Sequence, residues 1–158
     1  MKKYIVYASK YGFTEKCVRL LQEQLPEYSL WNLQEAAPDD IKGAEALVIG
    51  GPVYAGRFPK KLSLWIQQEE DWAKDRVQGL FLTALSDRDT AEGYFQSNFP
   101  ESWRAKEPAR AFFGGGLDFS RLNWFESFLL KKLMKIKQDI SNLDLAEIKN
   151  LSQELKSS

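Results

Sequence analysis

Hydroxyl and glycine residues at fixed spacing follow a short apolar run near the start of the sequence. The run at 4–8 leads into a Ser-x-x-Gly-x-Thr pattern that consists of Ser9, Lys10, Tyr11, Gly12, Phe13 and Thr14. A strand that leads into the N-terminus of a helix presents free backbone N–H groups, and these groups and the helix dipole favour a bound anion. The pattern lacks the spacing of a nucleotide P-loop and of a dinucleotide-binding motif, so it favours a single terminal phosphate, as on FMN. The alternative is an ordinary strand-to-helix turn that Thr14 caps.

A loop rich in glycine and proline follows a second apolar run at 46–50. Its central residues are Pro52, Val53, Tyr54, Ala55 and Gly56. The ring of Tyr54 is suited to stack on a flat cofactor ring. Glycine tolerates both signs of φ, so the peptide at Gly56 can change orientation beside a flavin and stabilise its one-electron-reduced form. The alternative is a structural loop around a buried tyrosine.

A third candidate loop ends the strand predicted at 77–85. The backbone N–H groups of Thr83, Ala84, Leu85 and Ser86 are candidates to donate hydrogen bonds to the pyrimidine edge of a flavin. The alternative is that Ser86 and Asp87 cap the segment that follows.

The composition excludes several kinds of chemistry. The 158 residues carry a formal net charge of zero, which argues against nucleic-acid binding through a basic surface. The chain contains no histidine, so histidine-metal sites and Ser-His-Asp or Cys-His catalysis are excluded. The single cysteine, Cys17, excludes an intrachain disulfide and a cysteine-ligated cluster, and we expect a buried structural thiol. Redox chemistry in such a chain requires a bound cofactor, and no metal is expected.

We expect a cytoplasmic protein. The start of the chain does not resemble a signal peptide. In addition, no stretch approaches the roughly 20 apolar residues that a membrane-spanning helix needs.

Strand and helix patterns alternate along the chain. Strands are predicted at 3–8, 28–33, 46–50, 77–85 and 110–115, and helices at 14–25, 59–68, 121–138 and 145–156, with shorter helical segments near 41–43 and 89–97. This alternation predicts one α/β domain over 1–158, with a five-stranded parallel sheet and helices on both faces. Five strands suit the order 2-1-3-4-5, in which ligands bind beyond the carboxyl ends of the strands.

Two of the loops together resemble the flavodoxin superfamily. Residues Ser9 to Thr14 are similar to the family's phosphate loop, and Val48-Ile49-Gly50-Gly51-Pro52-Val53-Tyr54-Ala55-Gly56 is similar to its second flavin loop. The resemblance covers nearly the full chain. It implies a flavodoxin-like three-layer sandwich that binds FMN and transfers electrons to redox partner proteins, with no catalytic side chain.

The last third of the chain has a narrower resemblance. The segments 111–119, 123–126 and 129–135 are similar to the menaquinone-dependent protoporphyrinogen oxidase branch of the superfamily. This similarity implies an alternative function as an FMN-dependent oxidoreductase that acts on a porphyrin or a quinone. The predicted helix 121–138 is amphipathic and basic, so we expect either peripheral contact with the inner face of a membrane or a core helix with a solvated lysine face.

Overall fold

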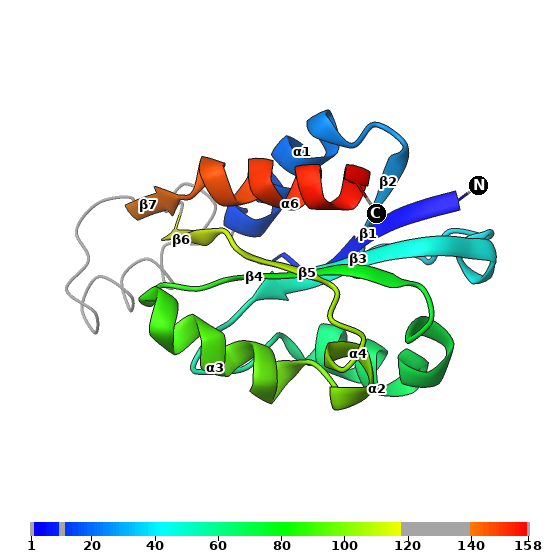
Figure 1. The fold of residues 1–158 in the computed structure, drawn as a ribbon. Coiled ribbons are helices and arrows are strands. Elements are labelled where there is room, and N and C mark those ends of the chain that lie inside the picture. The colour runs from blue at the N-terminus through cyan, green and yellow to red at the C-terminus, as the bar shows by residue number, and fades with distance from the viewer. Residues whose placement is uncertain (1, 10–11, 118–139, 158) are drawn as a thin grey trace.

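The computed structural model of this protein describes residues 2–9, 12–117 and 140–157. Figure 1 shows the path of the chain through strands and helices. Their order is β1 (Lys2–Tyr7), α1 (Phe13–Gln24), β2 (Tyr28–Asn32), η1 (Ile41–Gly43), β3 (Ala44–Pro52), α2 (Lys60–Ala73), β4 (Val77–Thr83), α3 (Arg88–Asn98), α4 (Glu101–Arg104), β5 (Ala109–Phe112), β6 (Gly114–Leu117), β7 (Ile140–Leu143) and α6 (Leu145–Ser157).

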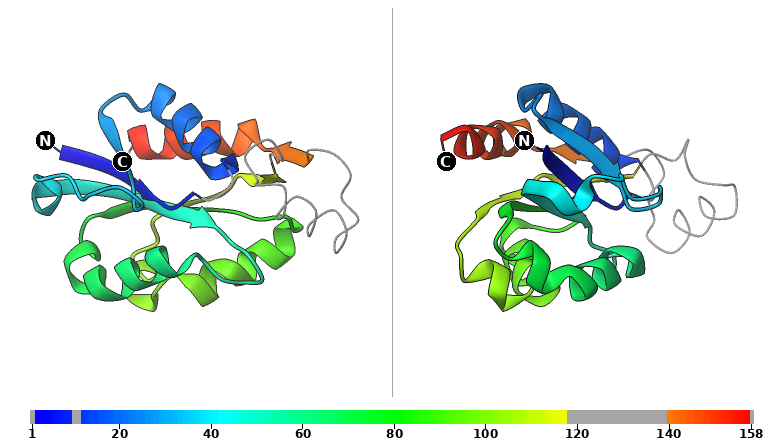
Figure 2. Two further views of the ribbon diagram at one scale, coloured as in Figure 1. Left: turned by 180° about the vertical axis from the view of Figure 1, so that it is seen from behind. Right: turned by 90° about the vertical axis from the view of Figure 1, so that its right-hand side faces the viewer.

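The main sheet has five strands in the order β2-β1-β3-β4-β5, and every neighbouring pair is parallel. The predicted α/β class and the predicted order 2-1-3-4-5 are therefore confirmed. Figure 2 shows the three layers, with α1 and α6 on one face of the sheet and α2, α3 and α4 on the other. Parallel strands need crossover connections, and the helices of this chain supply them.

The two faces of the sheet bury separate apolar clusters because neighbouring side chains of a strand point to opposite faces. In β3, Ile49 joins the cluster beneath α2 and α3, whereas Val48 joins the cluster beneath α1 and α6. Cys17 belongs to the second cluster and is fully buried, which confirms the predicted structural thiol.

The first and last helices lie side by side on one face of the sheet (Figure 1). Their apolar residues recur at helical spacing, with Val18 and Leu21 in α1 and Ile148 and Leu151 in α6. The Ser152 hydroxyl of α6 also donates a hydrogen bond of 2.6 Å to Oε1 of Gln24 at the end of α1. The helix that follows the Ser-x-x-Gly-x-Thr loop is therefore packed along one side by α6.

The end of the fifth predicted strand differs from the prediction. Strand β5 ends at Phe112, and the chain turns at Gly114, whose φ is 86°. It continues as β6, which pairs antiparallel with β7 in a second, two-stranded sheet. The prediction of one strand at 110–115 was wrong because Gly114 adopts the left-handed backbone region, which interrupts an extended strand. The short helix α4 and the strand β7 were not predicted.

The other elements begin and end close to their predicted positions. The exceptions are α2, which continues to the buried Ala73, and β3, which continues through two glycines to Pro52. The predicted helix 121–138 lies outside the described residues. Within the described part of the chain, no helix combines the length and the apolar character needed to cross a membrane.

Candidate functional site

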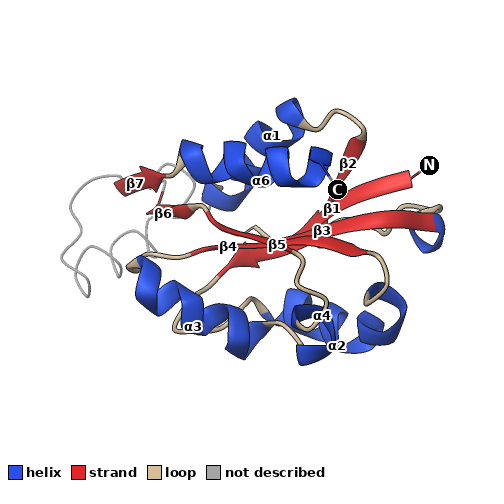
Figure 3. Cartoon of the chain, viewed as in Figure 1, coloured by secondary structure: helices blue, strands red, loops and turns tan. Residues whose placement is uncertain are grey.

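The three candidate loops meet at one edge of the sheet. Strands β1, β3 and β4 are parallel neighbours that end at Tyr7, Pro52 and Thr83, so the loops after them start at the same edge. We call this edge the carboxyl edge; in Figure 3 it lies on the side of the molecule away from the label N. Ligands of open parallel sheets bind beyond this edge, where the strand order reverses.

Buried polar side chains gather at the carboxyl edge. The described residues include four buried polar side chains, and three of them are predicted site residues, Ser9, Thr14 and Thr83, with exposed fractions of 9%, 2% and 3%. The hydroxyl oxygens of Thr14 and Thr83 lie 2.9 Å apart. Buried hydroxyls require hydrogen-bond partners, and in this pair each hydroxyl serves as the partner of the other.

The loop after β1 presents the N-terminus of α1. Gly12 occupies the N-cap position with a φ of 88° and supplies no side-chain cap, so the alternative in which Thr14 caps the helix was wrong. The Ser9 hydroxyl accepts a hydrogen bond of 3.3 Å from the amide of Glu15. The amides of Phe13 and Thr14 lie in the first turn, where no intrahelical acceptor exists, and such amides favour an anion. Lys10 and Tyr11 lie outside the described residues.

A carboxylate in the first turn of α1 is compensated by its neighbours. Glu15 accepts hydrogen bonds of 2.8 Å from the Tyr7 hydroxyl and 2.9 Å from Arg19. Burial and the hydrogen bond to Glu15 raise the pKa of Tyr7, so Tyr7 remains a neutral donor. The negative charge of Glu15 in the first turn of α1 is therefore partly offset by Arg19 and by the hydrogen bond from Tyr7.

Two glycines near the end of β3 allow close packing on both faces of the sheet. A Cβ atom on Gly50 would lie 2.3 Å from the carbonyl oxygen of Phe81, and one on Gly51 would lie 2.7 Å from a methyl group of Leu62. Gly50 is on the same face as Thr83, and β3 separates β1 from β4 in the sheet. Gly50 lies opposite Phe81, so its missing side chain leaves room on this face for the backbone of β4.

The loop after β3 contains a tight turn. Tyr54 and Arg57 exchange backbone hydrogen bonds of 2.9 and 3.1 Å, and Ala55 and Gly56 between them have φ values of 49° and 83°. Positive φ at both central residues is typical of a type I′ turn. The turn presents Tyr54 at the surface with 39% of the residue exposed, so the alternative of a buried tyrosine was wrong.

Residues at the start of this loop are part of the core. Pro52 is the last residue of β3, and the amide of Val53 donates a hydrogen bond of 2.8 Å to the carbonyl oxygen of Thr83. The Val53 side chain packs in the cluster beneath α2 and α3. Pro52 and Val53 therefore fix the position from which the exposed turn projects.

A residue that sequence reasoning missed holds the turn. The Asn98 side chain, at the end of α3, donates a hydrogen bond of 3.1 Å to the carbonyl oxygen of Gly56 and accepts one of 3.0 Å from the amide of Phe58. Asn98 is 42 residues from Gly56 in the sequence, so no local pattern connects the two.

The loop after β4 is shaped by β6. The amide of Ala84 donates a hydrogen bond of 2.9 Å to the carbonyl oxygen of Gly114, so this predicted cofactor contact is already used within the protein. A Cβ atom on Gly115 would lie only 2.1 Å from the carbonyl oxygen of Ala84. Leu85, the next residue, is 44% exposed at the carboxyl edge.

The cap interpretation of this loop is confirmed for Asp87. Its carboxylate accepts a hydrogen bond of 2.7 Å from the amide of Thr90 at the start of α3. The Ser86 hydroxyl donates to the carbonyl oxygen of Asp87. Ser86 therefore contributes its hydroxyl to the local turn.

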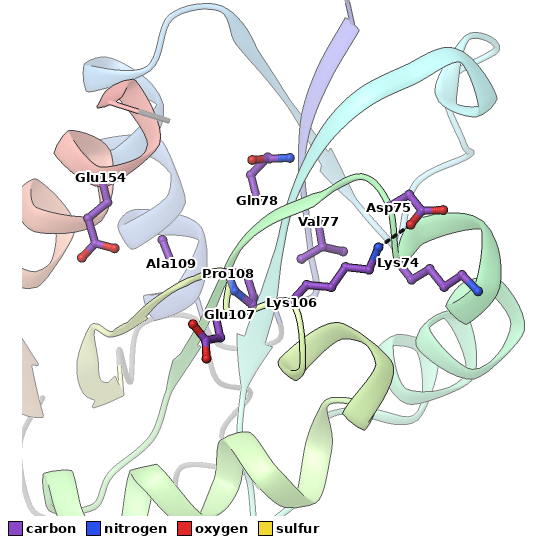
Figure 4. Close-up of a pocket in the computed structure, with 9 residues that line it drawn as sticks. All are labelled: Lys74, Asp75, Val77, Gln78, Lys106, Glu107, Pro108, Ala109 and Glu154. Atoms are coloured by element: carbon purple, nitrogen blue, oxygen red, sulfur yellow. Dashed lines mark hydrogen bonds and ion pairs between the residues drawn. The ribbon is translucent and has the colours of Figure 1, made fainter.

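A polar pocket on the opposite edge of the sheet is a less suitable cofactor site. It lies at the amino ends of β4 and β5, next to Val77 and Ala109, and Figure 4 shows that charged side chains line it. Lys106 and Asp75 form an ion pair there. None of the three candidate loops adjoins these residues. Ligands of this sheet type bind at the carboxyl edge. Among the described residues, no cluster of acidic or cysteine side chains could hold a metal ion.

The family profile of the flavodoxin domain matches residues 4–144. This chain belongs to the flavodoxin family. No curated protein matches the sequence. The family membership supports the predicted FMN cofactor and the predicted role in electron transfer, and it agrees with the loops that meet at the carboxyl edge.

Solved structures share the fold of this flavodoxin. A short-chain flavodoxin associated with a PDU bacterial microcompartment matches with a TM-score of 0.61 and 14% identity, over 99% of this chain and 98% of the other. A flavodoxin of Streptococcus pneumonia TIGR4 has a TM-score of 0.54 and 14% identity, over 99% and 96% of the two chains. The rubredoxin oxygen:oxidoreductase of Desulfovibrio gigas has a TM-score of 0.55 and 12% identity, over 98% of this chain and 34% of that enzyme.

Proposed function

We propose that this flavodoxin binds FMN at the carboxyl edge and carries electrons between redox partner proteins. The observation that carries the proposal is the contact between Thr14 and Thr83. It joins the N-terminus of α1 to the end of β4, beside the point between β1 and β3 where the strand order reverses. A phosphate at the first turn of α1 therefore lies beside the loops that could contact a flat ring.

Some residues of the three loops contact the cofactor, and others hold the contacting residues in position. Ser9, Gly12, Phe13 and Thr14 offer backbone amides and hydroxyls to the phosphate, together with Lys10 and Tyr11. The exposed turn Tyr54-Ala55-Gly56 offers an aromatic ring and backbone to one side of the flavin, and Leu85 and Ser86 offer backbone to its edge. Pro52, Val53, Thr83 and Ala84 position these residues through the core and through β6. FMN supplies the electron chemistry when it is bound, so no acid–base side chain is required.

A comparison of FMN with riboflavin tests the cofactor and the phosphate site together. We expect purified protein mixed with FMN to retain a flavin absorption spectrum after gel filtration, and calorimetry to show weaker binding of riboflavin, which has no phosphate. Thr14→Val is expected to weaken FMN binding and to leave riboflavin binding nearly unchanged. Glu154→Gln, in the pocket on the opposite edge, is the matched control. Protein that stays colourless with excess FMN would contradict the proposal.

A quinone or porphyrin oxidoreductase is the second candidate function, and the similarity of residues 111–135 to the protoporphyrinogen oxidase branch favours it. Anaerobic assays with protoporphyrinogen IX and menadione separate the two functions. A carrier is expected to exchange electrons with protein partners and to turn over neither small molecule, whereas sustained porphyrin oxidation would replace the carrier proposal. Sedimentation with anionic vesicles tests the predicted membrane contact of residues 121–138, which a cytoplasmic carrier does not need.

A further inference from the structure

The peptide between Gly56 and Arg57 is held at both of its polar atoms. Its carbonyl oxygen accepts a hydrogen bond of 3.1 Å from Nδ2 of Asn98, and its N–H donates one of 3.1 Å to the carbonyl oxygen of Tyr54. If this peptide turned over, both hydrogen bonds would break. The orientation change expected from the glycine at 56 is therefore opposed by the rest of the protein.

Asn98 binds the loop as a neighbouring strand would. A side-chain amide offers the same donor and acceptor as a peptide group, and Asn98 uses them on Gly56 and on the amide of Phe58, two residues further on. Nδ2 also donates to the carbonyl oxygen of Tyr94 within α3, at 3.0 Å. The ring of Phe58 packs edge-on against Phe99, with ring centres 5.0 Å apart. The segment from Gly56 to Phe58 is thus held to the end of α3.

The other peptide of the turn, between Ala55 and Gly56, is restrained by the residue type at position 55. If this peptide turned over, it would convert the type I′ turn to a type II′ turn, which requires glycine at the first central position. Alanine occupies that position, with a φ of 49°. The required combination of positive φ and strongly negative ψ is essentially restricted to glycine.

We propose that Asn98 is a positioning residue that keeps the Tyr54–Arg57 turn in one conformation in every oxidation state of the cofactor. The effect of Asn98 on the redox potentials rests on the proposed FMN function. A turn that cannot reorient offers no new hydrogen bond to the ring after the first electron has been taken up. The potentials of the first and second electrons are therefore expected to lie close together, which suits partners that exchange electrons in pairs.

Amide hydrogen exchange in the cofactor-free protein tests the structural part directly. Asn98→Asp keeps an acceptor for Phe58 and removes the donor to Gly56, whereas Asn98→Ala removes both. We expect the amide of Arg57 to exchange roughly tenfold faster in both variants, because both lose the hydrogen bond to the Gly56 carbonyl oxygen that restrains the turn. The amide of Phe58 is expected to become faster only in Asn98→Ala. Gln96→Ala, an exposed change on the same helix, is the control.

Unchanged exchange at Arg57 in a folded Asn98→Asp protein would overturn the proposal. If Asn98→Ala does not fold, the exchange rate of the Arg57 amide in Asn98→Asp tests the proposal by itself.

Reductive titration of the FMN-loaded proteins with dithionite tests the redox part. We expect Asn98→Asp and Ala55→Gly each to raise the equilibrium constant for uptake of the first electron by up to about tenfold. A tenfold change corresponds to about 59 mV for one electron. Potentials that match those of the wild type in both variants would overturn the proposal. If no variant and no wild-type protein binds FMN, the proposed function fails, whereas the exchange rates still decide whether Asn98 holds the turn.

Discussion

The hydroxyl oxygens of Thr14 and Thr83 lie 2.9 Å apart although 69 residues separate them in the chain. Thr14 belongs to the first turn of α1, and Thr83 is the last residue of β4. A pair of hydroxyls has two protons, and one of them is used within the pair. The other proton is not used within the pair, and under the proposed function it is the one that would be donated to a phosphate oxygen.

A double-mutant cycle measures the coupling within this pair. Thr14→Val and Thr83→Val each remove one hydroxyl and leave the other buried without its partner, so each is expected to lower the free energy of unfolding by about 1–2 kcal/mol. The double variant is expected to lose less than the sum of the two losses, because it leaves no unpaired hydroxyl. Urea unfolding at pH 7 measures the three changes. Strict additivity would mean that the two hydroxyls do not interact.

Gly115→Ala tests the support that β6 gives to the loop after β4. The new methyl group would overlap the Ala84 carbonyl group, which is backbone and moves only with the loop. We expect a loss of about 1–3 kcal/mol in the free energy of unfolding and weaker FMN binding. Gly93→Ala is the control, because no atom lies within 4 Å of its added Cβ and alanine favours the α3 helix by about 0.5–1 kcal/mol. Equal stability of the two variants would contradict the close approach at Gly115.

The carboxylate of Asp87 predicts a pH dependence of stability. The hydrogen bond from the Thr90 amide holds the pKa of Asp87 below its ordinary value of 3.8. A lowered pKa in the folded state contributes stability that is present above the unfolded pKa and is lost as the pH falls through the folded pKa. Asp87→Asn keeps an N-cap that does not titrate. Urea midpoints from pH 7 to pH 2 are expected to fall further for the wild type than for this variant, and parallel curves would contradict the cap.

The buried thiol of Cys17 reports the opening of α1. Burial raises the pKa of this thiol to about 12, so at pH 8 it is neutral as well as inaccessible. Only the thiolate is nucleophilic, and labelling with Ellman's reagent is therefore expected to be at least about 100-fold slower in the native protein than in urea. FMN is expected to slow labelling further, because a ligand at the N-terminus of α1 stabilises the closed helix. Rapid labelling of the native protein would show that α1 opens easily.

The fold could be predicted well because each strand and helix is marked by a pattern within its own residues. Strand and helix patterns alternate, Pro59 marks the start of α2, and the buried face of α1 recurs at helical spacing, so each element could be recognised from its own residues. The strand order then followed from general rules for parallel sheets. The same rules placed the loops after β1, β3 and β4 at a common edge, where the structure also has them.

Contacts between distant segments could not be predicted in this way. The Asn98 side chain reaches Gly56, and Gly115 packs on Ala84, but neither pairing leaves a periodic pattern in the sequence. The turn at Gly114 was missed for a related reason, since the apolar residues before it, Ala111, Phe112 and Phe113, favour a strand that continues. A glycine triplet marks backbone freedom without saying which conformation the neighbouring elements select.

The packing of α1 beside α6 makes the candidate phosphate loop depend on a segment far along the chain. Helix α1 carries the candidate phosphate loop, whereas α6, which packs against it, is synthesised well over 100 residues later. The sequence separation of 128 residues between Gln24 and Ser152 makes this contact a late event in folding. Nascent chains that end before α6 are therefore expected to remain free of FMN until α6 has been synthesised and has packed against α1.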